Sequence, residues 1–437
     1  MKHNLISIIC HDLGRTLGCY GHSDVRSLSI DAFSDSSIRF DNCFCTAPQC
    51  SPSRAALWTG RYPHSTGVIG LTHGGFGSDL NAGERHLAQI LGDNGYVTYL
   101  EGLQHEARTP ERCGFMHMGK TGNCGRVADS ACDLIQSNSF SDRPFYLQIG
   151  FFEPHRPFPH EGVEIKNPAC MNVPAYLPDI PQIREDLADM EASIAAVDIA
   201  IGRIMKSIRD AGLMNNSIIM FTADHGIAFP HAKMTLYDPG IEVPLIMHIP
   251  GITGGKTYPQ MISNVDIVPT ILDLLSIEIS PAVQGASFKG LIFGEAYTHR
   301  TAVFSEKTYH TYYDPMRAIR TEQWKLIANF ENAPYQETSP DYDNNAKSYV
   351  ETSLAMKVPY KDQYHPPFEL YDLQSDPLER QNLADSPGHL KIRDGLIREL
   401  RRWMMDTTDP LLEGAVASGA YKHRMEVFKE IDAKPDL

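Results

Sequence analysis

The chain has 437 residues, of which 42% are hydrophobic, and its formal net charge is −15 at neutral pH. This length exceeds one ordinary hydrophobic core and favours a large domain with a smaller one. The negative charge argues against nucleic acid and acidic membrane surfaces as partners, and no apolar run approaches the length of a membrane span.

Short β-branched apolar runs alternate with amphipathic segments over the first 300 residues. The expected strands are Leu5–Cys10, Arg39–Cys45, Val97–Glu101, Phe145–Phe151, Ser217–Thr222 and Leu245–Ile249. The expected helices begin near Ser53, Glu84, Asp186 and Val265. This alternation predicts an α/β fold with a mainly parallel sheet flanked by helices.

The pattern changes after about residue 300. Antiparallel strands are expected at Ala302–Ser305, Met316–Arg320, Trp324–Phe330 and Phe368–Tyr371, with an amphipathic helix over Leu390–Met405. The polar segment Glu331–Asp362 is expected to form a long loop. We therefore predict a catalytic α/β domain over residues 1–300 and a smaller C-terminal α+β subdomain over residues 301–437.

Cysteine usage and the N-terminus bear on the cellular compartment. The chain goes straight into a strand-like run and lacks the apolar region and cleavage site of a signal peptide. Nine cysteines, an odd number, all lie between Cys10 and Cys170, which favours reduced thiols. We expect a cytoplasmic location, or a periplasmic one if a leader has been removed. Cys43 and Cys45 alternate with other residues in a way that suits packing in a buried strand better than metal binding.

The segment from Cys50 to Arg61 reads Cys-Ser-Pro-Ser-Arg-Ala-Ala-Leu-Trp-Thr-Gly-Arg. Pro52 suits the first turn of a helix, and Gly60 suits its end. Cys50 would then lie at the helix N-terminus, where free amides and the helix dipole favour an anion, and Arg54 would face the same site one turn later. Taken alone, the segment also fits a buried cysteine beside a capped helix.

Two acid–imidazole pairs follow expected strands directly. His11-Asp12 follows Leu5–Cys10, and Asp224-His225 follows Ser217–Thr222. Ligands of open α/β sheets bind beyond the carboxyl ends of the strands, so these pairs predict a divalent-metal site. For either pair alone, a capping or surface role is the alternative.

The Cys-x-Pro-x-Arg segment resembles the signature of the type I, formylglycine-dependent sulfatases of the alkaline phosphatase superfamily. The resemblance implies an alkaline-phosphatase-like fold in which Cys50 is oxidised to Cα-formylglycine by a formylglycine-generating enzyme or radical maturase. Hydrated formylglycine supplies the nucleophile, and Arg54 steadies the diol. The resemblance also implies that Asp12, Asp224, His225 and the oxygen at residue 50 hold one divalent metal ion.

Calcium is the ion that the resemblance implies, with manganese or magnesium as alternatives. The family usually has aspartate at the position of His11. His11 is therefore a further candidate ligand, and the alternative is that it does not bind the metal. Imidazole is a softer ligand than carboxylate, and two histidines with two aspartates suit Mn, Fe or Zn better than an all-oxygen site does.

Three further residues match family motifs. Lys233 precedes Tyr237-Asp238-Pro239-Gly240, a segment similar to the one whose lysine grips the sulfate. His155, after Pro154, resembles the histidine that contacts the sulfate or the leaving group. His105, in Gly-Leu-Gln-His, matches the histidine that helps to eliminate sulfate as a base. Alone, each would suit a surface lysine or a structural histidine.

Leu103 is a larger departure, because it stands where the family has a lysine that bridges formylglycine and substrate. Arg108 and Lys120 are the candidates to replace that charge. The alternatives are that no side chain replaces the lysine and the reaction is slower, or that the substrate has a different leaving group.

We predict a sulfuric ester hydrolase that acts on a small, carbohydrate substrate carrying a sulfate ester or a sulfamate. The segment Phe368–Leu383 is similar to one that is common in sulfatases. The chain resembles the heparan N-sulfatases (N-sulfoglucosamine sulfohydrolases) most, through Gly226–Pro230, Pro315–Arg317 and Asp406–Pro410. The alternatives are a phosphonate or phosphate ester hydrolase of the same superfamily and a catalytically silent binder of sulfated sugars.

Overall fold

The computed structural model of the protein describes residues 3–137, 140, 143–333 and 364–431. Its main sheet has eight strands in the order β4-β3-β5-β1-β6-β7-β2-β8, and β7 pairs antiparallel with β6 and with β2 while the other pairs are parallel. The strands are β1 Asn4–Cys10, β2 Ile38–Phe44, β3 Val97–Gly102, β4 His117–Met118, β5 Phe145–Gly150, β6 Ser217–Ala223, β7 Glu242–His248 and β8 Lys256–Ser263. This sheet confirms the predicted fold class.

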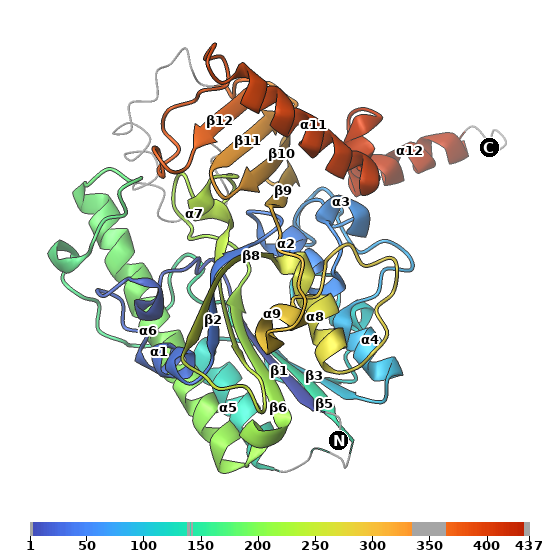
Figure 1. Cartoon of the computed structure of the whole chain (residues 1–437). Helices are drawn as coiled ribbons and strands as arrows, with labels where there is room; N and C mark the ends of the chain where they lie inside the picture. Colours follow the sequence, from blue (N-terminus) through green and yellow to red (C-terminus); the bar gives the residue numbers. More distant parts are fainter. Residues whose placement is uncertain (1–2, 138–139, 141–142, 334–363, 432–437) are drawn as a thin grey trace.

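Helices cover both faces of the main sheet (Figure 1). On one face lie α1 Leu28–Asp35, α5 Cys124–Gln136 and α6 Pro181–Asp210; on the other lie α2 Cys50–Thr59, α4 Leu87–Asp93, α8 Ile267–Leu274 and α9 Lys289–Phe293. Alternate residues of β1 serve the two cores: Leu5 and Ile9 pack with Trp58 of α2, whereas Ile6 and Ile8 pack on the side of α5 and α6. The central strand is therefore buried on both faces.

Shorter helices connect these elements. They are α3 Pro63–Thr66, α7 Asp238–Ile241 and the 3₁₀ turns η1 Gly18–Tyr20, η2 Pro110–Cys113, η3 Pro168–Cys170, η4 Leu213–Asn216, η5 Asn264–Asp266 and η8 Pro410–Leu412. Cys43 and Cys45 are both 1% exposed and belong to the core, as the sequence predicts. None of the helices in the described part of the chain combines the length and apolar composition that a membrane crossing needs.

A second, antiparallel sheet follows, in the order β12-β11-β10-β9. Its strands are β9 Ala302–Tyr309, β10 Tyr313–Thr321, β11 Trp324–Asn329 and β12 Phe368–Asp372. Helix α11, Leu390–Asp406, packs on this sheet through Leu400 and Trp403, and α12, Gly419–Ile431, extends away from the rest of the molecule (Figure 1). The four strands and α11 confirm the predicted smaller sheet and helix. Most of the expected loop Glu331–Asp362 lies outside the described residues.

The second sheet touches the chain that leads to Cys50. In β9, the Glu306 amide donates to the Thr46 carbonyl at 2.8 Å, and the Ser305 hydroxyl donates to the Cys45 carbonyl at 2.7 Å. The predicted division at residue 300 falls between α9 and β9. It stays a prediction, because these hydrogen bonds join the smaller sheet to the segment between β2 and α2. The smaller sheet therefore helps to place the segment that enters α2.

A buried ionic cluster ties the smaller sheet to the last part of the chain. Arg317 of β10 binds Asp409 through two hydrogen bonds, Nε to Oδ2 at 2.6 Å and Nη2 to Oδ1 at 3.0 Å. Glu306 lies 3.4 Å from Arg317 Nε and also binds His64 of α3, and all four side chains are almost completely buried. Two of the three segments that resemble the heparan N-sulfatases, those around Arg317 and Asp409, thus meet in one structural contact.

Replacing Arg317 by methionine should lower the free energy of unfolding by about 3–5 kcal/mol, because it leaves the carboxylates of Asp409 and Glu306 buried without their cation. Urea unfolding of the purified variant measures this. The matched control is Arg203→Met, which removes an ion pair to Asp129 whose side chains are 48% and 58% exposed, and should cost less than about 1 kcal/mol. Equal losses in the two variants would contradict the assignment of Arg317 as a stabilising residue.

Candidate functional site

The site lies at one edge of the main sheet, beyond the carboxyl ends of four adjacent parallel strands. His11 and Asp12 follow β1, and Asp224 and His225 follow β6, its parallel neighbour. In the same way His105 comes after β3 and His155 after β5, and the sheet order β3-β5-β1-β6 places these four strands side by side. Sheet topology therefore gathers side chains that are far apart in the sequence.

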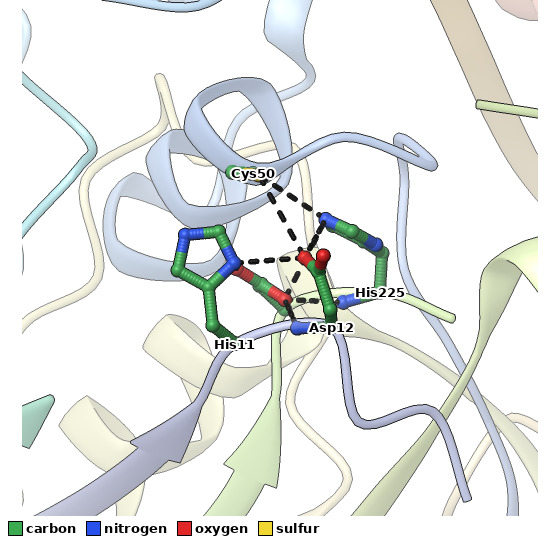
Figure 2. A group of neighbouring side chains, drawn as sticks. His11, Asp12, Cys50 and His225 are labelled. Carbon is green, nitrogen blue, oxygen red and sulfur yellow. Dashed lines mark hydrogen bonds and ion pairs between the residues drawn. The ribbon is translucent and has the colours of Figure 1, made fainter. Parts of the chain in front are cut away.

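Five buried side chains converge at this edge: His11, Asp12, Cys50, Asp224 and His225. Figure 2 labels four of them, His11, Asp12, Cys50 and His225. Asp12 Oδ1 lies 2.8 Å from His11 Nδ1, 3.1 Å from His225 Nε2 and 3.9 Å from Cys50 Sγ. The sulfur is 3.3 Å from His225 Nε2, and His11 Nδ1 is 3.3 Å from Asp224 Oδ2. No member of the group is more than 2% exposed. The sulfur of residue 50 thus shares one small volume with the two carboxylates.

Backbone geometry holds the acid–imidazole pairs in place. Asp12 adopts a left-handed φ of 50°, which non-glycine residues seldom do, and its amide donates to Asp224 Oδ1 at 2.9 Å. The Nδ1 of His225 faces the Gly226 carbonyl at 2.9 Å, where only its protonated form can donate. That contact turns Nε2 toward Asp12 and Cys50, and in the neutral ring the lone pair of Nε2 would point there, as a metal-binding histidine needs.

Two buried cations complete the site. Lys233 Nζ lies 2.7 Å from Asp12 Oδ2 and 3.2 Å from His155 Nε2, and its side chain is 1% exposed. Arg54 Nε donates to Asp224 Oδ2 at 2.8 Å. Its two Nη atoms are buried, and the described residues offer them no hydrogen-bond partner. Buried guanidinium donors are seldom left unpaired, so this position suits an anionic ligand.

The surroundings of Cys50 stabilise negative charge. Burial alone would raise the pKa of the Cys50 thiol, but the charges of His11, Lys233 and His225 outweigh it and hold that pKa well below its ordinary value. Burial likewise opposes protonation of His11, yet the negative charges at Cys50, Asp224 and Asp12 raise the pKa of His11 to about 9. The N-terminus of α2 adds its dipole and free amides at the same point.

Cys50 is the first residue of α2, and its position is fixed by neighbouring side chains. The Ser53 hydroxyl donates to the Asp224 carbonyl, and Asn264 Nδ2 donates to the Ser53 hydroxyl at 3.1 Å. As the sequence predicts, α2 ends at Gly60, whose φ is 70° and whose amide donates to the Ala56 carbonyl. The helix therefore begins against the carboxyl end of β6.

His105 reaches the cluster through ring contacts, with its ring centroid 5.6 Å from that of His11. Its neighbour Glu106 is fully buried and accepts from the His105 amide at 2.6 Å and from Gln148 Nε2 at 2.9 Å. Burial alone would raise the pKa of Glu106, but His86 and Arg54 lower it to about 2, so Glu106 is a carboxylate. Glu106 thus connects the loop that carries His105 with the environment of Arg54.

The structure brings together every side chain that the sequence singles out for this site: His11, Asp12, Cys50, Arg54, His105, His155, Asp224, His225 and Lys233. Their roles remain predictions. Sequence reasoning missed Glu106, Asn264 and His73, whose ring stacks on His105 at 4.5 Å. Only Glu106 gave a signal, as a charged residue beside a candidate histidine.

The two candidates to replace the missing lysine lie elsewhere. Arg108 and Lys120 are both exposed, and their backbone amides bind Asp79 and Glu101, respectively. The cations whose charges lower the pKa of Cys50 most are instead His11, Lys233 and His225. Neither Arg108 nor Lys120 therefore supplies the charge that Leu103 lacks.

Comparison with known proteins gives two family matches. The family described as Sulfatase matches residues 3–277, and the one described as N-sulphoglucosamine sulphohydrolase, C-terminal, matches residues 225–351. The N-sulphoglucosamine sulphohydrolase of Homo sapiens is 28% identical over 459 residues, covering 93% of this chain and 91% of its own length.

Solved structures share the fold at low sequence identity. One, described as a complex with its substrate D-glucosamine-2-N,6-O-disulfate, has a TM-score of 0.72 at 20% identity and covers 94% of this chain and 99% of its own. A phosphonate monoester hydrolase from Silicibacter pomeroyi has a TM-score of 0.75 at 19% identity, covering 96% of this chain and 100% of its own.

Proposed function

We propose that this chain, which belongs to the sulfatase family, removes sulfate, held as a sulfamate or a sulfate ester, from a small sulfated sugar. The human relative supports this substrate class by its name, N-sulphoglucosamine sulphohydrolase. The net charge of −15 also disfavours long polyanions and leaves a small anion in a locally positive pocket as the better substrate. The observation that carries the proposal is the position of Cys50, 3.3 Å from His225 and 3.9 Å from Asp12 at the start of α2.

The nucleophile in this proposal is Cα-formylglycine, formed from Cys50 by a formylglycine-generating enzyme or a radical maturase. When present, this group supplies a hydroxyl that attacks sulfur. Residue 50 lies at the N-terminus of α2, where the helix dipole favours negative charge. Arg54 is held by its hydrogen bond to Asp224 and by the nearby charge of Glu106. The free Nη atoms of Arg54 would then bind the hydroxyl oxygens.

A divalent metal ion fits the same position. His225 Nε2, His11 Nδ1 and one oxygen each from Asp12 and Asp224 would hold it together with an oxygen at residue 50. The orientation of His225 by the Gly226 carbonyl supports this, because it leaves the lone pair of Nε2 directed inward. Such an ion supplies Lewis-acid polarisation of a sulfate oxygen when bound.

Lys233 and His155 would hold the sulfate and pass a proton to the leaving oxygen or nitrogen. His155 Nδ1 is held by the Arg156 carbonyl at 2.6 Å, which turns Nε2 toward Lys233 at 3.2 Å. His105, whose ring centroid lies 5.6 Å from that of His11, would remove the proton that lets sulfate leave. Positioning and charge neutralisation then carry most of the rate, as in phosphoryl transfer.

Turnover of a small substrate panel tests this function. Matured protein should release sulfate from N-sulfoglucosamine or an O-sulfated glucosamine faster than it cleaves an aryl phosphonate. Faster cleavage of the phosphonate would favour the second candidate, a phosphonate or phosphate ester hydrolase. The imidazole content of the metal cluster and the shared fold of the Silicibacter pomeroyi enzyme favour that candidate. Binding of the sugars without turnover by fully matured protein would indicate a silent binder.

Replacing Glu106 by glutamine should lower kcat/KM for the sulfated sugar about 10- to 100-fold, because a charged acceptor for the His105 amide and a neighbour of Arg54 are lost. The matched control is Glu101→Gln, which changes another buried carboxylate at the end of β3 and should leave kcat/KM within about threefold. Steady-state kinetics on equally matured samples measures both. Equal losses in the two variants would show that Glu106 has no special role.

We also keep the cytoplasm as the proposed location. All nine cysteines are free thiols in the structure, which a reducing compartment favours. Separating the cytoplasmic and periplasmic fractions of the source cells, with an antibody against the protein, tests this.

A further inference from the structure

Four side chains surround Cys50 as possible metal ligands: His11, Asp12, Asp224 and His225. Two of these four offer an imidazole nitrogen. We propose that the site selects a first-row divalent ion such as Mn²⁺ over Ca²⁺, and that His11 Nδ1 is the ligand that sets this preference. The inference rests on the proposed function, because it concerns the metal of the same site. It departs from the calcium that the family resemblance implies.

The first reason is that the site has few carboxylate oxygens available for Ca²⁺. Asp12 Oδ2 is bound by Lys233 at 2.7 Å, and Asp224 Oδ2 by Arg54 at 2.8 Å. Each carboxylate therefore has one oxygen engaged by a cation, which competes with a metal ion for that oxygen. Ca²⁺ prefers about six to eight oxygen ligands. In the described part of the chain the group contains no third carboxylate, so calcium would depend largely on water and substrate.

The remaining oxygens are constrained as well. Asp224 Oδ1 already accepts from the amides of Asp12 and His225, each at 2.9 Å. Asp12 Oδ1 stands between the two imidazoles, 2.8 Å from His11 and 3.1 Å from His225. The site thus offers a tight set of two nitrogens and two oxygens, and mixed sets of this kind suit Mn²⁺, Fe²⁺ and Zn²⁺.

The imidazoles are also fixed in position. The ring of His11 packs against His155, with centroids 4.7 Å apart, and against Phe152 at 5.9 Å and His105 at 5.6 Å. His225 is held by the Gly226 carbonyl. Because both rings are buried and packed, they cannot swing aside to admit extra oxygen ligands, and the nitrogen donors are part of any ion's environment here.

Competition between two ions tests the proposal. Metal-stripped, matured protein is dialysed against equimolar Mn²⁺ and Ca²⁺, and the bound metal is measured by inductively coupled plasma mass spectrometry. We expect Mn²⁺ to be bound in clear excess. The His11→Asp variant, with an oxygen in place of the nitrogen, should lower the Mn²⁺ over Ca²⁺ preference at least about tenfold. His423→Asp is the matched control, because His423 is 79% exposed, and it should change nothing.

A spectroscopic measurement adds a readout that is independent of activity. Electron spin-echo envelope modulation of bound Mn²⁺ should show two coordinated imidazole nitrogens in the wild type and one in His11→Asp. His11→Asn replaces the aspartate variant if that variant does not fold. Repeating the experiment in a Cys50→Ser background removes the thiol as a soft ligand. Preferential Ca²⁺ uptake by the wild type, or two imidazole signals that persist in both His11 variants, would overturn the proposal. Sulfate release with bound Ca²⁺ would contradict the metal preference but not the proposed function. If the protein bound no divalent ion at all, neither the metal preference nor the role of a metal in the proposed function would hold.

Discussion

Replacing Cys50 by alanine is expected to reduce sulfate release by roughly 10⁴- to 10⁶-fold, the loss that follows removal of a nucleophile. Cys50 starts α2, is 2% exposed and lies within 3.9 Å of both Asp12 and His225. Alanine cannot be converted to an aldehyde, so the proposed hydroxyl is lost while the surrounding charges remain. Initial rates with N-sulfoglucosamine or an aryl sulfate measure the effect.

The control for this variant is Cys132→Ala. Cys132 is a buried thiol of α5 on the opposite face of the sheet from α2, and it belongs to that face's hydrophobic core. Its loss should cost some stability and leave the rate within about threefold. Substantial sulfate release by Cys50→Ala, from a preparation free of other sulfatases, would show that residue 50 is not the nucleophile.

Replacing Lys233 by methionine should lower kcat roughly 10²- to 10³-fold, the effect of removing one group that stabilises charge in a transition state. Lys233 is 1% exposed and bridges Asp12 and His155, so its ammonium would lie beside the sulfate in the proposed reaction. Lys233→Arg keeps the charge and should retain more activity. Lys206→Met, at a position 71% exposed, should have no effect.

Separate values of kcat and KM show what Lys233 does. A fall in kcat with little change in KM fits a contact that strengthens in the transition state, and a rise in KM alone would assign Lys233 to substrate binding only. A rate for Lys233→Met equal to that of the wild type would contradict its place in the site.

Much of the fold follows from local patterns. The strands β1 and β6 are short apolar runs followed directly by an acid–imidazole pair, and this combination predicts both the strand and the site position that follows it. After residue 300, the strands β9, β11 and β12 begin at the residues that the sequence predicts, and β10 begins at Tyr313 where Met316 is predicted. These elements are predictable because burial alone decides them.

Other elements escaped sequence reasoning for physical reasons. Helix α5 buries only two large apolar side chains, Val127 and Ile135, and the rest of its buried face consists of alanine and cysteine. Strand β8 lies at the edge of the sheet and is largely polar, because one side of it meets solvent. Glu106 and Asn264 act through hydrogen bonds to backbone and side chains brought together only by folding. No local pattern encodes such contacts.

The most direct measurement of the central claim relates the modification at residue 50 to the reaction. Protein samples co-expressed with increasing amounts of a maturase are analysed by peptide mass spectrometry for the fraction of chains that carry an aldehyde at residue 50. The same samples are assayed for sulfate release. The account predicts that the rate rises in proportion to the aldehyde fraction and vanishes with it. A rate that does not depend on this fraction would contradict it.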